Sequence, residues 1–256
     1  GLECRGEPLP QSDARLLADA PAPARCLALG AAARAATAGL EETFERALAD
    51  AEPAVRRAGM LAAAHVGWAP LLPRLREAAL RHTDPDADAV ALLGAIGEAA
   101  DEPLLLGCLD RPDLAAHAVQ ALGALGRVTA MPRLLDLLSD PQLGVLAAKA
   151  YLRLTGSEAA FGAMPFPRPQ MAEGEDESED LPPAPAAARA DWQRRQGSMP
   201  AATTWSYGCP VPHDALPTAF DELRLDARRD VHLRLRARGA AVPDLELEAQ
   251  ALRQRR

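Results

Sequence analysis

Apolar positions over the first 156 residues follow a helical period, and the pattern recurs roughly every thirty residues. Each copy of the pattern ends at a glycine, and these glycines are spaced by 30, 29 and 30 residues: Gly67, Gly97, Gly126 and Gly156. Eight residues before them lie small residues: Gly59, Ala89, Ala118 and Ala148. Four residues before them lie Ala63, Leu93, Leu122 and Leu152. Because these offsets share one helical face, each copy predicts a helix that a neighbour can approach closely.

A second helix is predicted after each glycine. Six residues beyond the first three glycines stand prolines, which are well tolerated in the first turn of a helix: Pro73, Pro103 and Pro132. Each pair of helices then closes with an aspartate that can cap the next helix: Asp50, Asp84, Asp110 and Asp140. An earlier, degenerate copy fits residues 19–50, with helices near 22–36 and 40–48.

One helical hairpin of this kind cannot bury its apolar face alone, so the copies over residues 1–156 are predicted to stack into an α-solenoid. Composition agrees, because only 4% of the residues are aromatic while 48% are hydrophobic. A sandwich or barrel of strands would need more aromatic and β-branched residues. The predicted fold class is therefore all-α, and a bundle of unrelated Ala-rich helices is the alternative.

The repeat stops after Gly156, and residues 157–190 are predicted to be an acidic, proline-rich linker. Residues 157–184 carry 7 acids against 1 Arg, which accounts for much of the net charge of −8. Five of these acids are candidates for partner binding: Glu175, Asp176, Glu177, Glu179 and Asp180. The run is interpreted either as a solvated linker or as an element that attracts a basic partner.

Residues 191–256 are predicted to form a C-terminal helical repeat or cap. Helices are expected over 214–223, over 226–238 up to Gly239, and from 243 towards 253. The segment 208–215 is similar to residues 6–14 in its glycine, its two prolines and its Asp-Ala pair. That similarity predicts the start of a second solenoid segment.

The copies over residues 19–156 resemble HEAT-like repeats of the short type found in bilin lyases and bacterial adaptor proteins. The resemblance implies a right-handed curved stack whose concave surface is lined by the second helices, and it implies no particular activity. The end of the stack at residues 151–156, the acidic stretch, Leu181-Pro182-Pro183 and Trp192 also resemble a bacterial HEAT-repeat family encoded near type VI secretion genes. That setting implies binding to secreted effectors, as immunity proteins do when they neutralise toxins.

Catalytic and metal-binding patterns are absent from the sequence. It contains no GxSxG, GxxxxGK[ST], HExxH or GxGxxG pattern, and its 5 histidines are isolated. Asp84, Asp86 and Asp88 begin like a calcium loop but lack the glycine and the terminal glutamate. The sequence therefore predicts no enzymatic activity, no cofactor and no metal.

Charge and cysteine content suggest a setting for the protein. An excess of 36 acids over 28 bases disfavours direct nucleic-acid binding. No apolar run is long enough for a membrane span, and no signal peptide is visible. The 4 scattered cysteines are expected to be free thiols of a cytoplasmic protein.

Two groups of residues are candidates for partner binding. Trp192, Trp205 and Tyr207 fall within 16 residues. They are interpreted as a binding hot spot or as a plug for the open end of the solenoid. Charged residues of the second helices are expected either to line the concave groove or to be ordinary solvated positions: Glu41, Glu45, Arg74, Glu77, Arg133 and Asp136.

The leading hypothesis is a non-enzymatic solenoid that binds another protein, most concretely an immunity protein for a type VI secretion effector. If that effector is a basic nuclease, acidic groups can take the place of phosphates and steer the encounter. The alternatives are an adaptor or scaffold of the secretion machinery, and a lyase acting on a tetrapyrrole as the HEAT-like bilin lyases do.

Overall fold

The computed structural model describes residues 20–34, 39–81, 86–163, 181–212, 216, 220, 223–240 and 242. These residues are mostly helical with one two-stranded sheet, which confirms the helical fold class. Contacts divide the chain into two compact units. Unit 1 comprises Gly1–Gly97 with Arg229–Arg256, and unit 2 comprises Glu98–Arg228.

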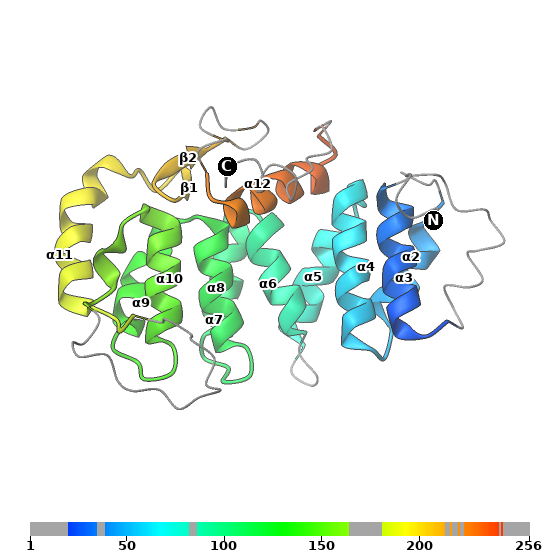
Figure 1. Ribbon diagram of the computed structural model, residues 1–256, viewed down its shortest axis with the longest axis horizontal. Helices are drawn as coiled ribbons and strands as arrows, with labels where there is room; N and C mark the ends of the chain where they lie inside the picture. Colours follow the sequence, from blue (N-terminus) through cyan, green and yellow to red (C-terminus); the bar gives the residue numbers. More distant parts are fainter. Residues whose placement is uncertain are drawn as a thin grey trace, which may run out of the picture. The chain divides into compact units, whose positions relative to one another are not determined.

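Unit 1 is built from helical pairs (Figure 1). Its elements are α2 (Ala22–Arg34), α3 (Glu41–Leu48), α4 (Pro53–Val66), α5 (Leu71–Leu80), α6 (Ala87–Ile96) and most of α12 (Leu225–Ala237). Helix α4 packs against α2, α3 and α6, and α5 packs against α6. At Gly59 of α4 an added Cβ would lie 2.6 Å from the Cβ of Ala47 in α3. The first member of the small-residue column is thus a point of close helix approach, as the sequence predicts.

Unit 2 continues the alternation of helices and adds a sheet. Its elements are η2 (Ala99–Asp101), α7 (Glu102–Cys108), α8 (Ala115–Leu125), η3 (Val128–Ala130), α9 (Met131–Leu137), α10 (Gly144–Thr155), η4 (Glu158–Ala160), α11 (Pro185–Arg195), η5 (Gln196–Ser198), β1 (Thr204–Ser206) and β2 (Cys209–Val211). Helix α8 packs against α7 and α10, and α9 packs against α10 and α11. Leu122, Leu134 and Leu154 are completely buried in the core between these helices.

The ends of the helices follow the repeat closely. Gly67, Gly126 and Gly156 end α4, α8 and α10 in the left-handed conformation, with φ of 71°, 80° and 69°. Gly97 ends α6 in an extended conformation instead. The repeat prolines all lie in first turns, at Pro73 of α5, Pro103 of α7 and Pro132 of α9.

Aspartates hold the turns between successive helical pairs. The Asp140 carboxylate accepts hydrogen bonds from two backbone N–H groups ahead of it, at 2.8 and 2.9 Å. Asp50 accepts one such bond at 2.9 Å. Before α6 the capping residue is Asp86, which accepts bonds of 3.1 and 3.2 Å, and the predicted Asp84 lies outside the described residues. Of these three, Asp86 caps a helix, because its bonds come from first-turn amides of α6. Asp50 and Asp140 instead bond to amides of the turns that precede α4 and α10.

The segment after α11 differs from the prediction of a second solenoid segment, because Cys209–Val211 form strand β2. This strand pairs antiparallel with β1 through a two-residue turn at Tyr207 and Gly208, whose φ angles are 50° and 77°. Two positive φ angles characterise the tight turn that joins antiparallel strands directly. The hairpin forms here because its backbone can bond to exposed helix ends. The Trp205 N–H donates to the Gly126 carbonyl at 2.8 Å, and the Gly208 N–H donates to the Leu154 carbonyl at 3.0 Å.

Helix α12 agrees with the helix predicted over residues 226–238, and Gly239 follows it with a φ of 74°. Most of the predicted helix over 214–223, and all of the one from 243, lie outside the described residues. Helix α11 begins at Pro185, within the range predicted to be a linker. It forms there because Ala188 is fully buried and Asp191 hydrogen-bonds to Tyr151 of α10. In the part of the chain that the structure describes, no helix is both long and apolar enough to cross a bilayer.

Candidate functional site

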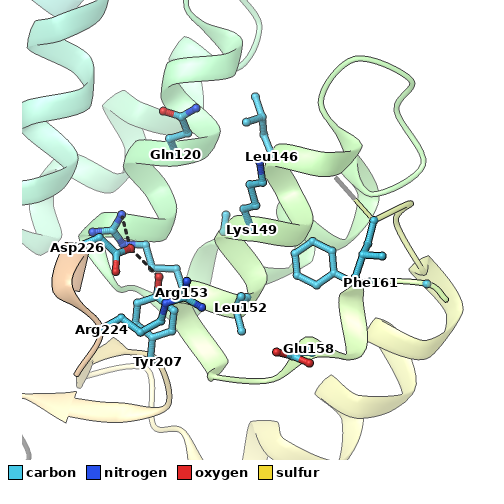
Figure 2. Close-up of a pocket in the computed structure, with 13 residues that line it drawn as sticks. Gln120, Leu146, Lys149, Leu152, Arg153, Glu158, Phe161, Tyr207, Arg224 and Asp226 are labelled. Atoms are coloured by element: carbon cyan, nitrogen blue, oxygen red, sulfur yellow. Dashed lines mark hydrogen bonds and ion pairs between the residues drawn. The ribbon is translucent and has the colours of Figure 1, made fainter. Parts of the chain in front are cut away.

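A cavity of about 640 Å³ opens beside α10 in unit 2 (Figure 2). We call it the α10 cavity. Its described lining residues come from α8, α10, η4, the residues around the β-bridge between Phe161 and Pro183, the hairpin turn and the start of α12. The volume lies within the range of ligand-binding pockets, about 300–1,000 Å³.

Polar side chains gather on one side of the α10 cavity (Figure 2). The Tyr207 hydroxyl donates to Oδ2 of Asp226 at 2.6 Å, and the Arg153 guanidinium lies 3.8 Å from the same oxygen. The Arg224 guanidinium carbon lies 5.4 Å from the centroid of the Tyr207 ring, in cation–π geometry. Burial and the bond to Asp226 raise the pKa of Tyr207 to about 12. At neutral pH this tyrosine is therefore an uncharged hydrogen-bond donor.

Apolar side chains form the other part of the wall. Leu146, Leu152, Phe161 and Leu181 all line the cavity and are only half-buried. The described lining also includes the exposed Lys149 and Glu158, Lys149 extending from the wall formed by α10 (Figure 2). Its charged residues are three cations and two carboxylates, so the described lining carries +1 in a chain of net charge −8.

The sequence builds this wall through helical spacing and a tight turn. Leu146, Lys149, Ala150 and Arg153 project from one face of α10, because residues three and four apart lie on the same side of a helix. Tyr207 is brought to the same place by the hairpin, whose turn passes the end of α10. An added Cβ at Gly156 would lie 2.5 Å from the Tyr207 carbonyl oxygen, so the close approach requires glycine there.

Tyr207 occupies a left-handed conformation that bulky residues rarely adopt. It is the only non-glycine residue with a positive φ in the described part of the chain. Such a conformation costs on the order of 1–3 kcal/mol and persists where the surroundings enforce it. Here the enforcing contacts are the bond to Asp226, the stacking of Arg224, and a backbone bond from the Tyr207 N–H to the Arg153 carbonyl at 2.5 Å.

The structure separates the three aromatic residues singled out in the sequence. Trp192 and Trp205 come together, packed with Val128 and Met199 in one hydrophobic cluster. Trp205 is only 9% exposed, and its indole N–H donates to the Pro200 carbonyl at 3.3 Å. Tyr207 instead faces the α10 cavity. Only Tyr207 of the three therefore contributes to that site.

Five of the six charged candidates on the second helices form ion pairs at the surface, and Glu41, at the start of α3, is exposed. In unit 1 Arg74 bonds to Glu45 at 2.9 Å and to Glu77 at 3.4 Å. In unit 2 Asp136 lies 3.4 Å from Arg189, and Arg133 lies 3.4 Å from Asp110. Exposed pairs of this kind contribute little to stability. The predicted Glu175, Asp176, Glu177, Glu179 and Asp180 lie outside the described residues.

Several residues of the α10 cavity were missed by sequence reasoning, namely Lys149, Arg153, Arg224 and Asp226. Two signals could have pointed to them. Lys149 is the only lysine in the chain, and it stands with Arg153 on the predicted helix that ends at Gly156. A Tyr-Gly pair between Thr-Trp-Ser and Cys-Pro-Val could also have been interpreted as a hairpin turn.

A second ionisable cluster, buried between α10 and α11, has a packing role. Oδ2 of Asp191 accepts bonds of 2.8 Å from the Tyr151 hydroxyl and from Nε of Arg195. Burial acts to raise the pKa of Asp191, but hydrogen bonds from Ser157, Tyr151 and Arg195 lower it below its ordinary value. Burial, together with Asp191, raises the pKa of Tyr151. The described residues contain no group of three or more His, Cys, Asp or Glu that could hold a metal ion.

Comparison with known protein families, with curated proteins and with solved structures found no match to this chain. The likeness to HEAT-like repeats thus depends on the sequence columns alone and stays a prediction.

Proposed function

We propose that this chain is a non-enzymatic protein-binding scaffold, a right-handed solenoid of stacked helical hairpins. Its partner is a secreted effector toxin, which it binds in the cytoplasm and neutralises as an immunity protein. The observation that carries the proposal is the α10 cavity, an exposed site of mixed polar and apolar character. Such sites recognise a ligand through a few placed polar groups on an apolar wall.

The chemistry of the cavity favours binding over catalysis. None of its described lining residues is His, Cys, Ser or Thr, and the two remaining candidates for proton transfer, Lys149 and Glu158, are exposed to solvent. Tyr207 keeps its proton at neutral pH because its pKa is about 12. The Asp226 carboxylate already accepts a hydrogen bond from the Tyr207 hydroxyl and lies near the Arg153 guanidinium. These groups are arranged to hold one another and to present a fixed surface.

The packing within each unit supports the proposed stack. In unit 1 the first helices of successive pairs, α2, α4 and α6, pack one against the next. In unit 2 the same relation holds between α8 and α10. At Gly123 of α8 an added Cβ would lie 3.0 Å from the Cα of Ala150 in α10. Neighbour-to-neighbour packing of equivalent helices is the arrangement of repeat proteins.

The charge of the chain supports a basic effector such as a nuclease. The net charge is −8, and acidic surfaces accelerate the encounter with basic partners. We expect the association rate to fall steeply as ionic strength rises, because salt screens the attraction between exposed charges. An association rate that is equal at low and high salt would contradict the electrostatic part of the proposal.

The test begins by capturing partners on the immobilised full chain from a lysate of its source cells and identifying them by mass spectrometry. Each captured protein is then expressed in a host cell with and without this chain. We expect one of them to stop growth when expressed alone and to be harmless when the chain is co-expressed. Growth inhibition that the chain does not relieve, or capture of secretion-apparatus subunits alone, would overturn the immunity function.

A further inference from the structure

We propose that the α10 cavity is the docking site for a short segment of the partner protein that carries a carboxylate beside an apolar side chain. This inference rests on the proposed function, because it assumes that the chain binds a protein. It adds the site of docking and the chemistry of the bound segment.

Charge complementarity argues for a carboxylate. The charged groups in the described lining sum to +1, whereas the chain as a whole carries −8. The described lining is therefore net positive in a protein that is net negative. Arg224 is exposed, and its planar guanidinium is held over the Tyr207 ring. No carboxylate among the described residues forms an ion pair with it. A guanidinium held in place in this way is suited to two parallel bonds with a carboxylate.

The arrangement of the wall argues for an apolar neighbour to that carboxylate. Figure 2 shows Arg224 and Tyr207 together, with Leu152 beside them and Phe161 farther along the wall. Leu146, Leu152 and Phe161 are half-buried, so each offers apolar surface that a bound side chain could cover. A peptide with an acidic residue next to Leu or Phe fits both features.

The conformation of Tyr207 is independent support for a binding role. The first central position of a turn with two positive φ angles is best filled by Asn, Asp or Gly. This chain places tyrosine there, at a φ of 50°, and directs the ring into the cavity wall. A strained residue held at the edge of a cavity indicates a function that its replacement by a better turn residue would lose.

The experiment uses a phage-displayed library of random dodecapeptides, selected on the immobilised full chain. We expect the enriched peptides to share Asp or Glu next to Leu or Phe. The variant Arg224→Glu should bind them at least about tenfold more weakly, because it replaces attraction by repulsion. The matched control is Arg57→Glu at an exposed position of unit 1, which makes the same charge change outside the described cavity lining and should alter the affinity less than about twofold.

A second variant separates binding from folding. Tyr207→Asn relieves the strained turn, which offsets the lost bond to Asp226 and the lost contact with Arg224. The melting temperature should therefore stay close to that of the unchanged chain, while the affinity for the enriched peptides should fall several-fold. An equal affinity of Tyr207→Asn and the unchanged chain would overturn the role of the tyrosine.

Three results would overturn the inference: no enriched peptide, enriched peptides without acidic residues, or equal binding by Arg224→Glu. Binding that appears only after Glu175, Asp176, Glu177, Glu179 and Asp180 are all neutralised would also overturn it, in favour of the chain's own acidic residues as occupant. Capture of the effector separates this failure from failure of the proposed function. If Arg224→Glu still captures and neutralises the effector, the docking site is wrong and the function stands. If the unchanged chain neutralises no captured protein, the function itself is wrong.

Discussion

Glycine residues in this chain meet three different local environments. Gly156 has a positive φ, and an added Cβ would collide with the Tyr207 carbonyl at 2.5 Å. Gly39 has a φ of 75° but nothing within 4 Å of an added Cβ. Gly107 lies inside α7, without a positive φ, and also has nothing within 4 Å. Comparison of the three positions therefore separates the energetic cost of a left-handed backbone from the cost of a steric collision.

Alanine substitutions at these glycines should change the free energy of unfolding in a fixed order. Gly107→Ala should stabilise by about 0.5–1 kcal/mol, because alanine restricts the unfolded chain and favours helix. Gly39→Ala should destabilise by about 1–2 kcal/mol through left-handed strain alone. Gly156→Ala should destabilise by more than about 2 kcal/mol, because strain and collision add. Urea denaturation measures all three, and equal losses at Gly39 and Gly156 would refute the role assigned to the hairpin contact.

Asp191 connects stability to pH. Its pKa in the folded protein lies below the ordinary value of 3.8, so folding favours the ionised carboxylate. The resulting stabilisation is complete above the unfolded-state pKa and is lost as the pH falls through the folded-state pKa. The protein should therefore lose stability on acidification below about pH 4, in part through this group.

The substitution Asp191→Asn should remove that part of the acid dependence. At pH 7 we expect a loss of about 1–3 kcal/mol, because three charge-assisted bonds to a carboxylate only 5% exposed are weakened. The free energy of unfolding should also fall less steeply between about pH 4 and pH 2. Asp136→Asn, at an exposed ion pair, is the control and should stay within about 0.5 kcal/mol at both pH values. An unchanged acid dependence in Asp191→Asn would show that other groups are responsible.

At the scale of elements, the hairpin of β1 and β2 serves as a cap for helix ends. It donates backbone bonds to carbonyls at the ends of α8 and α10, and these carbonyls have no partner within their own helices. Trp205 fixes the hairpin by packing with Trp192, Val128 and Met199. Two of the three aromatic residues predicted to bind a partner are thereby used inside unit 2.

Truncating Trp205 should release the hairpin. We expect Trp205→Ala to lower the free energy of unfolding by about 3–5 kcal/mol through the loss of a buried ring. The amides of Tyr207 and Gly208, which bond to the end of α10, should then exchange faster with deuterium. Gln193→Ala, at an exposed position of α11, is the control and should leave both amides protected. Unchanged exchange in Trp205→Ala would contradict the anchoring role.

At the scale of the whole molecule, the chain forms two compact units, and residues distant in sequence complete the first of them. Within unit 1 the Arg234 Nε–H of α12 donates to the Ala95 carbonyl at 2.9 Å. An added Cβ at Gly67 would lie 2.8 Å from the Arg236 carbonyl oxygen. Helix α12 therefore packs against the ends of α4 and α6, which belong to the first repeats.

Substitutions in the two units should have local effects. Leu235 of α12 is 2% exposed, and Leu235→Ala should destabilise unit 1 by about 2–5 kcal/mol. In this variant, the backbone amides of α4 and α6 should show most of the increase in hydrogen exchange. The matched variant Leu154→Ala, at a fully buried position of unit 2, should accelerate exchange mainly in α8 and α10. If each variant affected both units equally, the two would unfold as one cooperative body.

The sequence alone determined the helical fold class, most of the described helix ends, and Asp50 and Asp140 as turn residues. It did not indicate Asp86 as the cap of α6, and Asp110 pairs with Arg133 and makes no capping bond to α8. The features that the sequence determined could be predicted because they depend on local physics: side-chain periodicity, the φ freedom of Gly126 and Gly156, and the fixed φ of proline. The position of α12 could be predicted for the same reason.

The α10 cavity, and the packing of the hairpin against the helix ends, were decided only by tertiary structure. Residues 204–211 form strands because the ends of α8 and α10 offer them carbonyl partners, and no local pattern records those partners. The cavity brings Arg153 together with Tyr207, Arg224 and Asp226, which are more than fifty residues later in the chain. Contacts between residues so far apart have no fixed spacing along the chain and leave no periodic signal, so only the folded chain brings these side chains together.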